Sequence, residues 1–117
     1  MSVENVLGLA GTLAEAFKDS PELAAYRSAK CAVFGDADLA RRLIEYKKAH
    51  FEYRLRAMSG IPDAPDFDEE KMLSNAYSDL MLNERAREFL ERERAVFDLV
   101  NGINEILGEA YGEVDID

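Results

Sequence analysis

The residues best suited to chemistry in this chain are its one histidine, His50, and its one cysteine, Cys31. Nucleophilic catalysis requires a Ser or Cys activated by a nearby base. The apolar spacing places His50 in a helical stripe with Tyr46 and Tyr53, on a different predicted helix from Cys31. We interpret His50 as a core or interface residue, and we expect no catalytic residue and no enzymatic activity.

Metal and cofactor sites need more ligands than the sequence offers. A structural zinc site takes about four Cys or His residues, and a helical di-iron site takes two Glu-x-x-His motifs. The acidic stretch 63–70 lacks the spacing and the central glycine of a calcium loop. Gly8 and Gly11 lie within a predicted helix, with no strand before them and no phosphate-binding motif after them. The sequence therefore predicts no metal and no cofactor.

Composition favours one small helical domain. The 117 residues are 48% hydrophobic and 32% charged, with three prolines and a net charge of −10. Such acidity repels phosphate backbones and anionic membrane surfaces. No apolar run reaches the roughly 18 residues that would span a bilayer. Glu4 lies where a signal peptide would have basic residues, and a single cysteine forms no internal disulfide, so we expect a cytoplasmic protein.

Helix-capping and helix-breaking residues divide the chain into five predicted helices. One helix ends near Lys18 and the next begins at Pro21. The remaining breaks are expected at Gly35–Asp36, at 60–67 and at Asn83, with Asp36 or Asp38, Asp66 and Asn83 as N-caps. The last helix should end near Tyr111. We predict a single all-α domain over residues 1–112, followed by a frayed acidic tail over 113–117.

The two long predicted helices, the third and the fifth, carry broad apolar faces. The third has a stripe through His50 and a second one beside it through Ile44, Phe51, Leu55 and Met58. We expect the two helices to form a long antiparallel pair that leaves these faces half covered, so that a helical-bundle oligomer, a homodimer or homotetramer, completes the cover. The candidate interface residues are Leu43, Tyr46, His50, Tyr53, Phe89, Val96, Phe97, Val100, Ile103 and Leu107.

One group of basic residues contrasts with the acidic composition of the chain. The third predicted helix carries Arg41, Arg42, Lys47 and Lys48, which could form a basic strip for RNA. The same residues also suit an ordinary solvated face, because Arg41 and Glu45 have the spacing of a helical ion pair. Direct RNA binding through this strip is therefore the alternative function, and protein binding the main one.

Two segments resemble the YlbF/YmcA family, a helical family of competence regulators that includes YheA-like proteins. They are Leu13–Lys30 (LAEAFKDSPELAAYRSAK) and Asn83–Leu107 (NERAREFLERERAVFDLVNGINEIL), and Gly35–Asp38 followed by Leu39–Tyr46 matches the family's acidic break and long helix. The similarity covers about residues 6 to 111.

The resemblance implies an all-helical, oligomeric, cytoplasmic and non-catalytic regulatory adaptor. Some relatives control competence, sporulation and biofilm formation as subunits of a complex with a PSP1-domain protein that adjusts RNase Y-dependent RNA processing. Sister family members, a PSP1-domain protein and an RNase are thus the implied partners, beside a second copy of the chain. Some members hold an iron–sulfur cluster through cysteines. With Cys31 alone we expect no cluster on this chain, since such clusters need about four thiolates.

Overall fold

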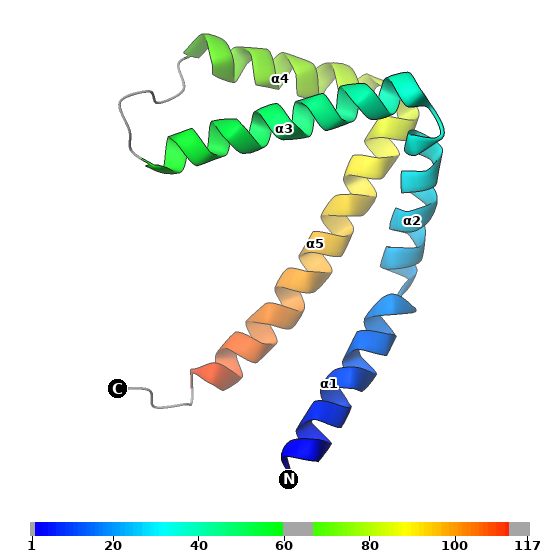
Figure 1. Ribbon diagram of the computed structural model, residues 1–117, viewed down its shortest axis with the longest axis vertical. Coiled ribbons are helices and arrows are strands. Elements are labelled where there is room, and N and C mark those ends of the chain that lie inside the picture. The colour runs from blue at the N-terminus through cyan, green and yellow to red at the C-terminus, as the bar shows by residue number, and fades with distance from the viewer. Residues whose placement is uncertain (1, 60–66, 113–117) are drawn as a thin grey trace. The chain divides into compact units, whose positions relative to one another are not determined.

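The computed structural model describes residues 2–59 and 67–112, and over these residues it contains five α-helices and no strand. The helices are α1 (Val3–Lys18), α2 (Pro21–Phe34), α3 (Ala37–Ser59), α4 (Phe67–Leu82) and α5 (Glu84–Tyr111), shown in Figure 1. The all-α prediction is confirmed, and the helices end within a residue or two of the predicted breaks. The predicted cap Asp66 and the tail 113–117 lie outside the described residues.

Side-chain caps explain why the helices begin where they do. The backbone N–H of Ala86 donates to Asn83 Oδ1 at 3.1 Å, and that of Leu39 donates to Asp36 Oδ1 at 3.1 Å. Ser20 Oγ accepts from the N–H of Leu23 at 3.3 Å, ahead of a helix that starts with proline. Each bond satisfies a donor that has no partner within its helix.

The chain divides into two compact units. The hairpin unit is Lys30–Phe89, and the terminal unit is Met1–Ala29 with Leu90–Asp117. Helices α2 and α5 each contribute residues to both units. The single domain expected over residues 1–112 stays a prediction.

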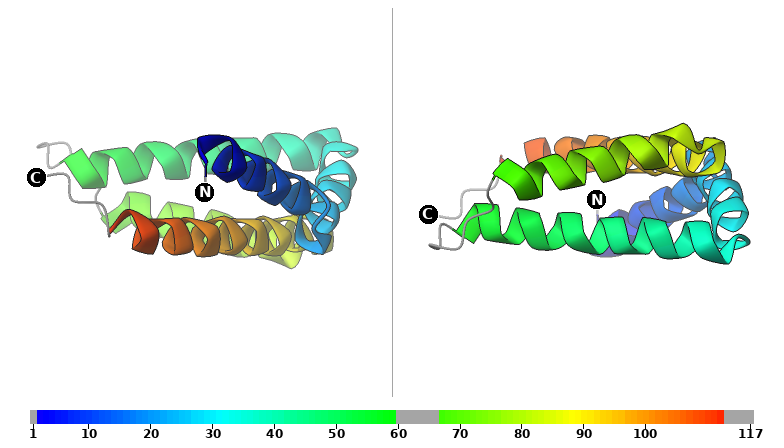
Figure 2. Two further views of the ribbon diagram at one scale, coloured as in Figure 1. Left: turned by 90° about the horizontal axis from the view of Figure 1, so that it is seen from below. Right: turned by 90° about the horizontal axis from the view of Figure 1, so that it is seen from above.

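The hairpin unit is built on α3 and α4, which run side by side in opposite directions (Figures 1 and 2). Its core side chains are at most 8% exposed and are Val33, Leu39, Ala40, Leu43, Leu80, Ala86 and Phe89. An ion pair between Arg56 and Glu69 links the C-terminal end of α3 to the first turn of α4. The helix that packs along α3 in this unit is α4, and the long pairing of α3 with α5 stays a prediction.

The terminal unit buries far less of its apolar surface. Ala29, at 6% exposure, is the one buried residue among those described in this unit, and α1 contains none. Helices normally gain most of their stability by packing an apolar face, because isolated helices of this length are marginal in water. The apolar face of α1 therefore lacks the cover that this kind of helix needs.

Candidate protein-interaction surfaces

The first candidate surface is the α1 face, defined here as Val3, Val6, Leu7, Ala10 and Leu13. These residues recur at steps of three and four and so share one side of the helix. The four large side chains are between 42% and 74% exposed. Ser2 caps the helix, accepting from the N–H of Asn5 at 3.2 Å. A well-formed amphipathic helix thus presents its apolar side to solvent, which is typical of a protein-binding surface.

Gly8 lies on the opposite side of α1 from this surface, and Gly11 lies beside it, one turn after Leu7. A methyl group added at Gly8 or Gly11 would meet no atom within 4 Å. Neither position is a close approach between helices in the described structure, and each lowers the intrinsic helix propensity of α1.

The second candidate surface is the C-terminal part of α5. Val96, Val100 and Ile103 are half-buried. Toward the helix end, the exposure rises to 41% for Leu107 and to 71% for Tyr111. The apolar face of α5 continues into the last turns of the helix, where the rest of the described chain leaves it exposed. These turns are therefore open to another protein.

The predicted interface residues are divided between the two units. Leu43 and Phe89 are 1% and 3% exposed, and they are core residues that present no surface to a partner. Three more lie half-buried in the hairpin unit: Tyr46, His50 and Tyr53. The other five lie on α5 in the terminal unit, three of them half-buried (Val96, Val100 and Ile103) and two exposed (Phe97 and Leu107).

The second stripe of α3 also lacks cover. Ile44, Phe51, Leu55 and Met58 are between 53% and 79% exposed. The hairpin unit therefore also has an exposed apolar surface.

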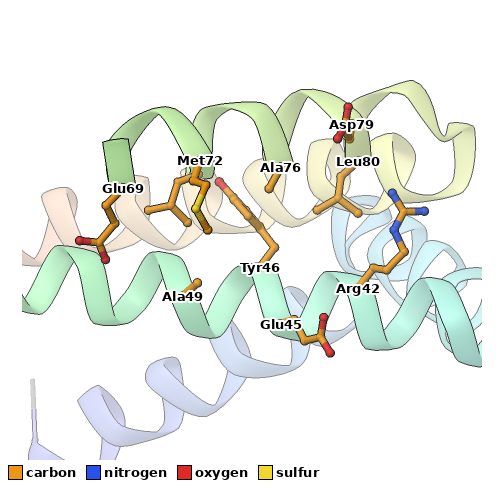
Figure 3. Close-up of a pocket in the computed structure, with 10 residues that line it drawn as sticks. Arg42, Glu45, Tyr46, Ala49, Glu69, Met72, Ala76, Asp79 and Leu80 are labelled. Carbon is orange, nitrogen blue, oxygen red and sulfur yellow. The ribbon is translucent and has the colours of Figure 1, made fainter. Parts of the chain in front are cut away.

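A groove of about 360 Å³ lies between α3 and α4 (Figure 3). Tyr46 extends from α3 toward α4, and Met72 and Ala76 extend from α4 toward α3. Arg42 lies near one end and Glu69 near the other, so the groove carries both signs of charge. An apolar floor with a mixed rim suits a segment of protein better than a small ligand of one charge.

A second hollow in the hairpin unit, the tyrosine pocket, is lined by Tyr46, His50 and Tyr53 of α3 and by Tyr77 and Glu70 of α4, and its volume is about 320 Å³. Tyr77 and Glu70 were not among the predicted site residues. One signal in the sequence could have identified them. Tyrosine and histidine recur at helical spacing on α3, and a tyrosine lies on α4, the helix that runs antiparallel to it.

Burial raises the pKa of Tyr46 above its ordinary value of 10.0, and interaction with Tyr77 raises it further. Both effects disfavour the phenolate, since burial penalises the charged form. The Tyr46 hydroxyl is therefore neutral over the physiological range.

The four candidate basic residues have different surroundings. Arg41 donates to Asp38 at 2.6 Å and to Glu45 at 3.4 Å, and these partners, Asp38 foremost, raise the pKa of its guanidinium. The ammonium of Lys47 lies 5.8 Å from the ring centroid of Phe89. Arg42 lines the groove, and Lys48 is exposed. Because successive helical residues point about 100° apart, the four do not line up as one strip.

The described residues offer no metal centre. Over that part of the chain, no group of three or more His, Cys, Asp or Glu side chains gathers closely enough to hold an ion. Cys31 is free and exposed. None of the described helices has the length and apolar character needed to cross a membrane.

Comparison with known proteins identifies the family. A sequence profile described as "Control of competence regulator ComK, YlbF/YmcA" matches residues 6–110. The chain belongs to the YlbF/YmcA family. Two UPF0342 proteins are similar to this family member over 108 residues, with 25% identity in Caldicellulosiruptor bescii and 26% in Caldicellulosiruptor saccharolyticus. These alignments cover 92% of this chain and 89% and 88% of the two relatives.

A solved structure shares the fold. It is the crystal structure of Bacillus subtilis RicA in complex with RicF, which matches with a TM-score of 0.63 over 96% of this chain and 97% of that one. The sequence identity is 19%, so this likeness concerns the fold. The YlbF/YmcA assignment made from the two sequence segments is confirmed.

Proposed function

We propose that this YlbF/YmcA protein is a non-enzymatic regulatory adaptor that acts by assembling with other chains through the α1 face and the end of α5. The observation that carries the proposal is that α1 is a capped, amphipathic helix without a buried residue. Covering a half-exposed Leu or Val contributes about 1 kcal/mol of stabilisation. Four such side chains on one helix therefore favour association by several kcal/mol before its entropic cost.

The natural occupants of these faces are a second copy of the chain or a sister family member. RicA, which shares the fold, was crystallised in complex with RicF, and this supports assembly as the mode of action. The family description concerns control of a competence regulator, which supports a regulatory role. We extend the proposal to a cytoplasmic complex with a PSP1-domain protein and an RNase that modulates RNase Y-dependent RNA processing.

The test is a charge placed on the α1 face. Leu7 is 65% exposed, so Leu7→Glu buries no charge within the chain itself, and its helical circular dichroism should stay unchanged. In an assembly the same carboxylate would be buried unpaired, at a cost of several kcal/mol. We expect sedimentation to show an oligomer for the parent chain and a lower mass for the variant.

Thr12→Glu is the matched control, because Thr12 lies on the opposite side of α1 and its hydroxyl donates to the carbonyl of Gly8 at 3.1 Å. This variant should keep the mass of the parent. Equal masses for all three proteins would refute self-assembly through the α1 face. The four dispersed basic residues give no support to direct RNA binding, which is not proposed.

A further inference from the structure

The tyrosine pocket brings four aromatic rings together within the hairpin unit. The rings of Tyr46 and His50 stack with centroids 5.8 Å apart, and those of Tyr46 and Tyr77 lie 5.9 Å apart at a tilt of 42°. Tyr53, the carboxylate of Glu70, and Leu73 and Ser74 of α4 complete the lining. Tyr77 is 42% exposed and the other three rings are half-buried, so the pocket is open to solvent on one side.

Such a lining favours positive charge. The face of an aromatic ring is electronegative, and a cation within about 6 Å of its centroid is attracted to it. A carboxylate at the same hollow adds a direct charge–charge attraction. The net charge of −10 raises the concentration of cations around the whole chain.

The lining also selects among cations. A small inorganic ion keeps its water shell unless several oxygen ligands replace it, and aromatic rings do not. Guanidinium and quaternary ammonium groups are weakly hydrated and can leave water for a ring face. A volume of about 320 Å³ accommodates a group of that size with room to spare.

We propose that the tyrosine pocket binds an organic cation, either the guanidinium of an arginine side chain on another protein or a free quaternary ammonium compound. The groove on the other flank of Tyr46 offers no comparable selectivity, because Arg42 lines it together with Glu45, Glu69 and Asp79. The site does not depend on assembly through the α1 face, so it can be tested in isolation from the proposed function.

The experiment titrates the full chain with two cations and their neutral counterparts, followed by NMR of the tyrosine ring signals. The probes are a capped Gly-Arg-Gly peptide against its citrulline analogue, and tetramethylammonium against tert-butanol. We expect saturable shifts with at least one cation that its neutral counterpart does not produce. The cation that binds more tightly identifies the source of the ligand.

Two variants locate the site. Tyr77→Leu removes a ring, and Glu70→Gln removes the charge while keeping the shape, so each should weaken cation binding about three-fold or more. Glu105→Gln is the matched control for the charge, since Glu105 is exposed in the terminal unit, and it should leave the affinity unchanged. Equal shifts with charged and neutral probes, or parental affinity in both pocket variants, would overturn the proposal.

Discussion

At the scale of the residue, Tyr46 has the most varied surroundings, since it lines both the groove and the tyrosine pocket. Its raised pKa ties the stability of the protein to alkaline pH. The unfolded chain loses this proton near pH 10, whereas the folded chain holds it to a higher pH. The contribution is therefore fully present below about pH 10 and is lost as the pH rises through the folded-state pKa.

We predict that Tyr46→Phe makes the free energy of unfolding less dependent on pH above about pH 10. The phenyl ring keeps the packing and has no proton to lose. Denaturant unfolding of both proteins should give a constant difference in unfolding free energy below about pH 10, and above it the parent should lose more stability than the variant. All other alkaline groups are common to the two proteins. Parallel curves up to pH 11, about one unit above the ordinary tyrosine pKa, would show that Tyr46 titrates alike in both states.

A second residue, Phe89, holds the core of the hairpin unit. Its ring is 3% exposed, meets the ring of Phe34 edge-on at 6.3 Å and lies beneath the ammonium of Lys47. Phe89→Ala should lower the unfolding free energy by about 3–5 kcal/mol, because it removes buried surface and leaves a cavity. Phe51→Ala, at a 60% exposed position of the same unit, should cost no more than about 1 kcal/mol in dilute solution. Similar losses from both changes would contradict this placement of the core.

At the scale of the element, helix starts were predictable because their causes are local. Asn83 shows this directly, since its side chain bonds to the N–H three residues later. Asn83→Ala should cost about 1 kcal/mol by thermal unfolding, because a donor at the start of α5 loses its partner. Asn101→Ala is the internal control: it lies exposed within the same helix, where alanine is the better helix former and stability should rise slightly. If Asn83→Ala were as stable as the parent, water would replace the side-chain cap.

Packing was harder to predict than helix boundaries. An apolar stripe shows which face of a helix is suited to packing, but it does not show whether that face is covered or which helix covers it. The two stripes of α3 suit α4 or α5 equally well in the sequence. A stripe also does not show how deeply each of its side chains is buried. Leu43 and Tyr46 lie on the same stripe, yet Leu43 is 1% exposed, whereas Tyr46 is half-buried and lines both the groove and the tyrosine pocket. The dispersal of the basic residues was accessible from helical geometry, because Arg41 and Lys47 are six positions apart and so face different sides.

At the scale of the whole molecule, the terminal unit poses the main physical question. Its helices are amphipathic, but α1 buries nothing and the end of α5 is open. A second chain that covers these faces would bind the folded protein and not the unfolded one. By mass action, the stability would then depend on protein concentration. A monomer whose faces are simply solvated would show no such dependence.

We therefore predict that the melting temperature rises with concentration. If folding is coupled to dimerisation, a hundred-fold increase adds about 2.7 kcal/mol for each dimer. Divided by the unfolding entropy of two chains of this length, this corresponds to a rise of about 5 °C. Scanning calorimetry over that range measures it directly, with Leu7→Glu as the variant that should lose the dependence. A parent chain whose melting temperature stays constant would mean that its exposed faces are not covered by a second copy, and the sister family chain would then be the partner to add to the same scan.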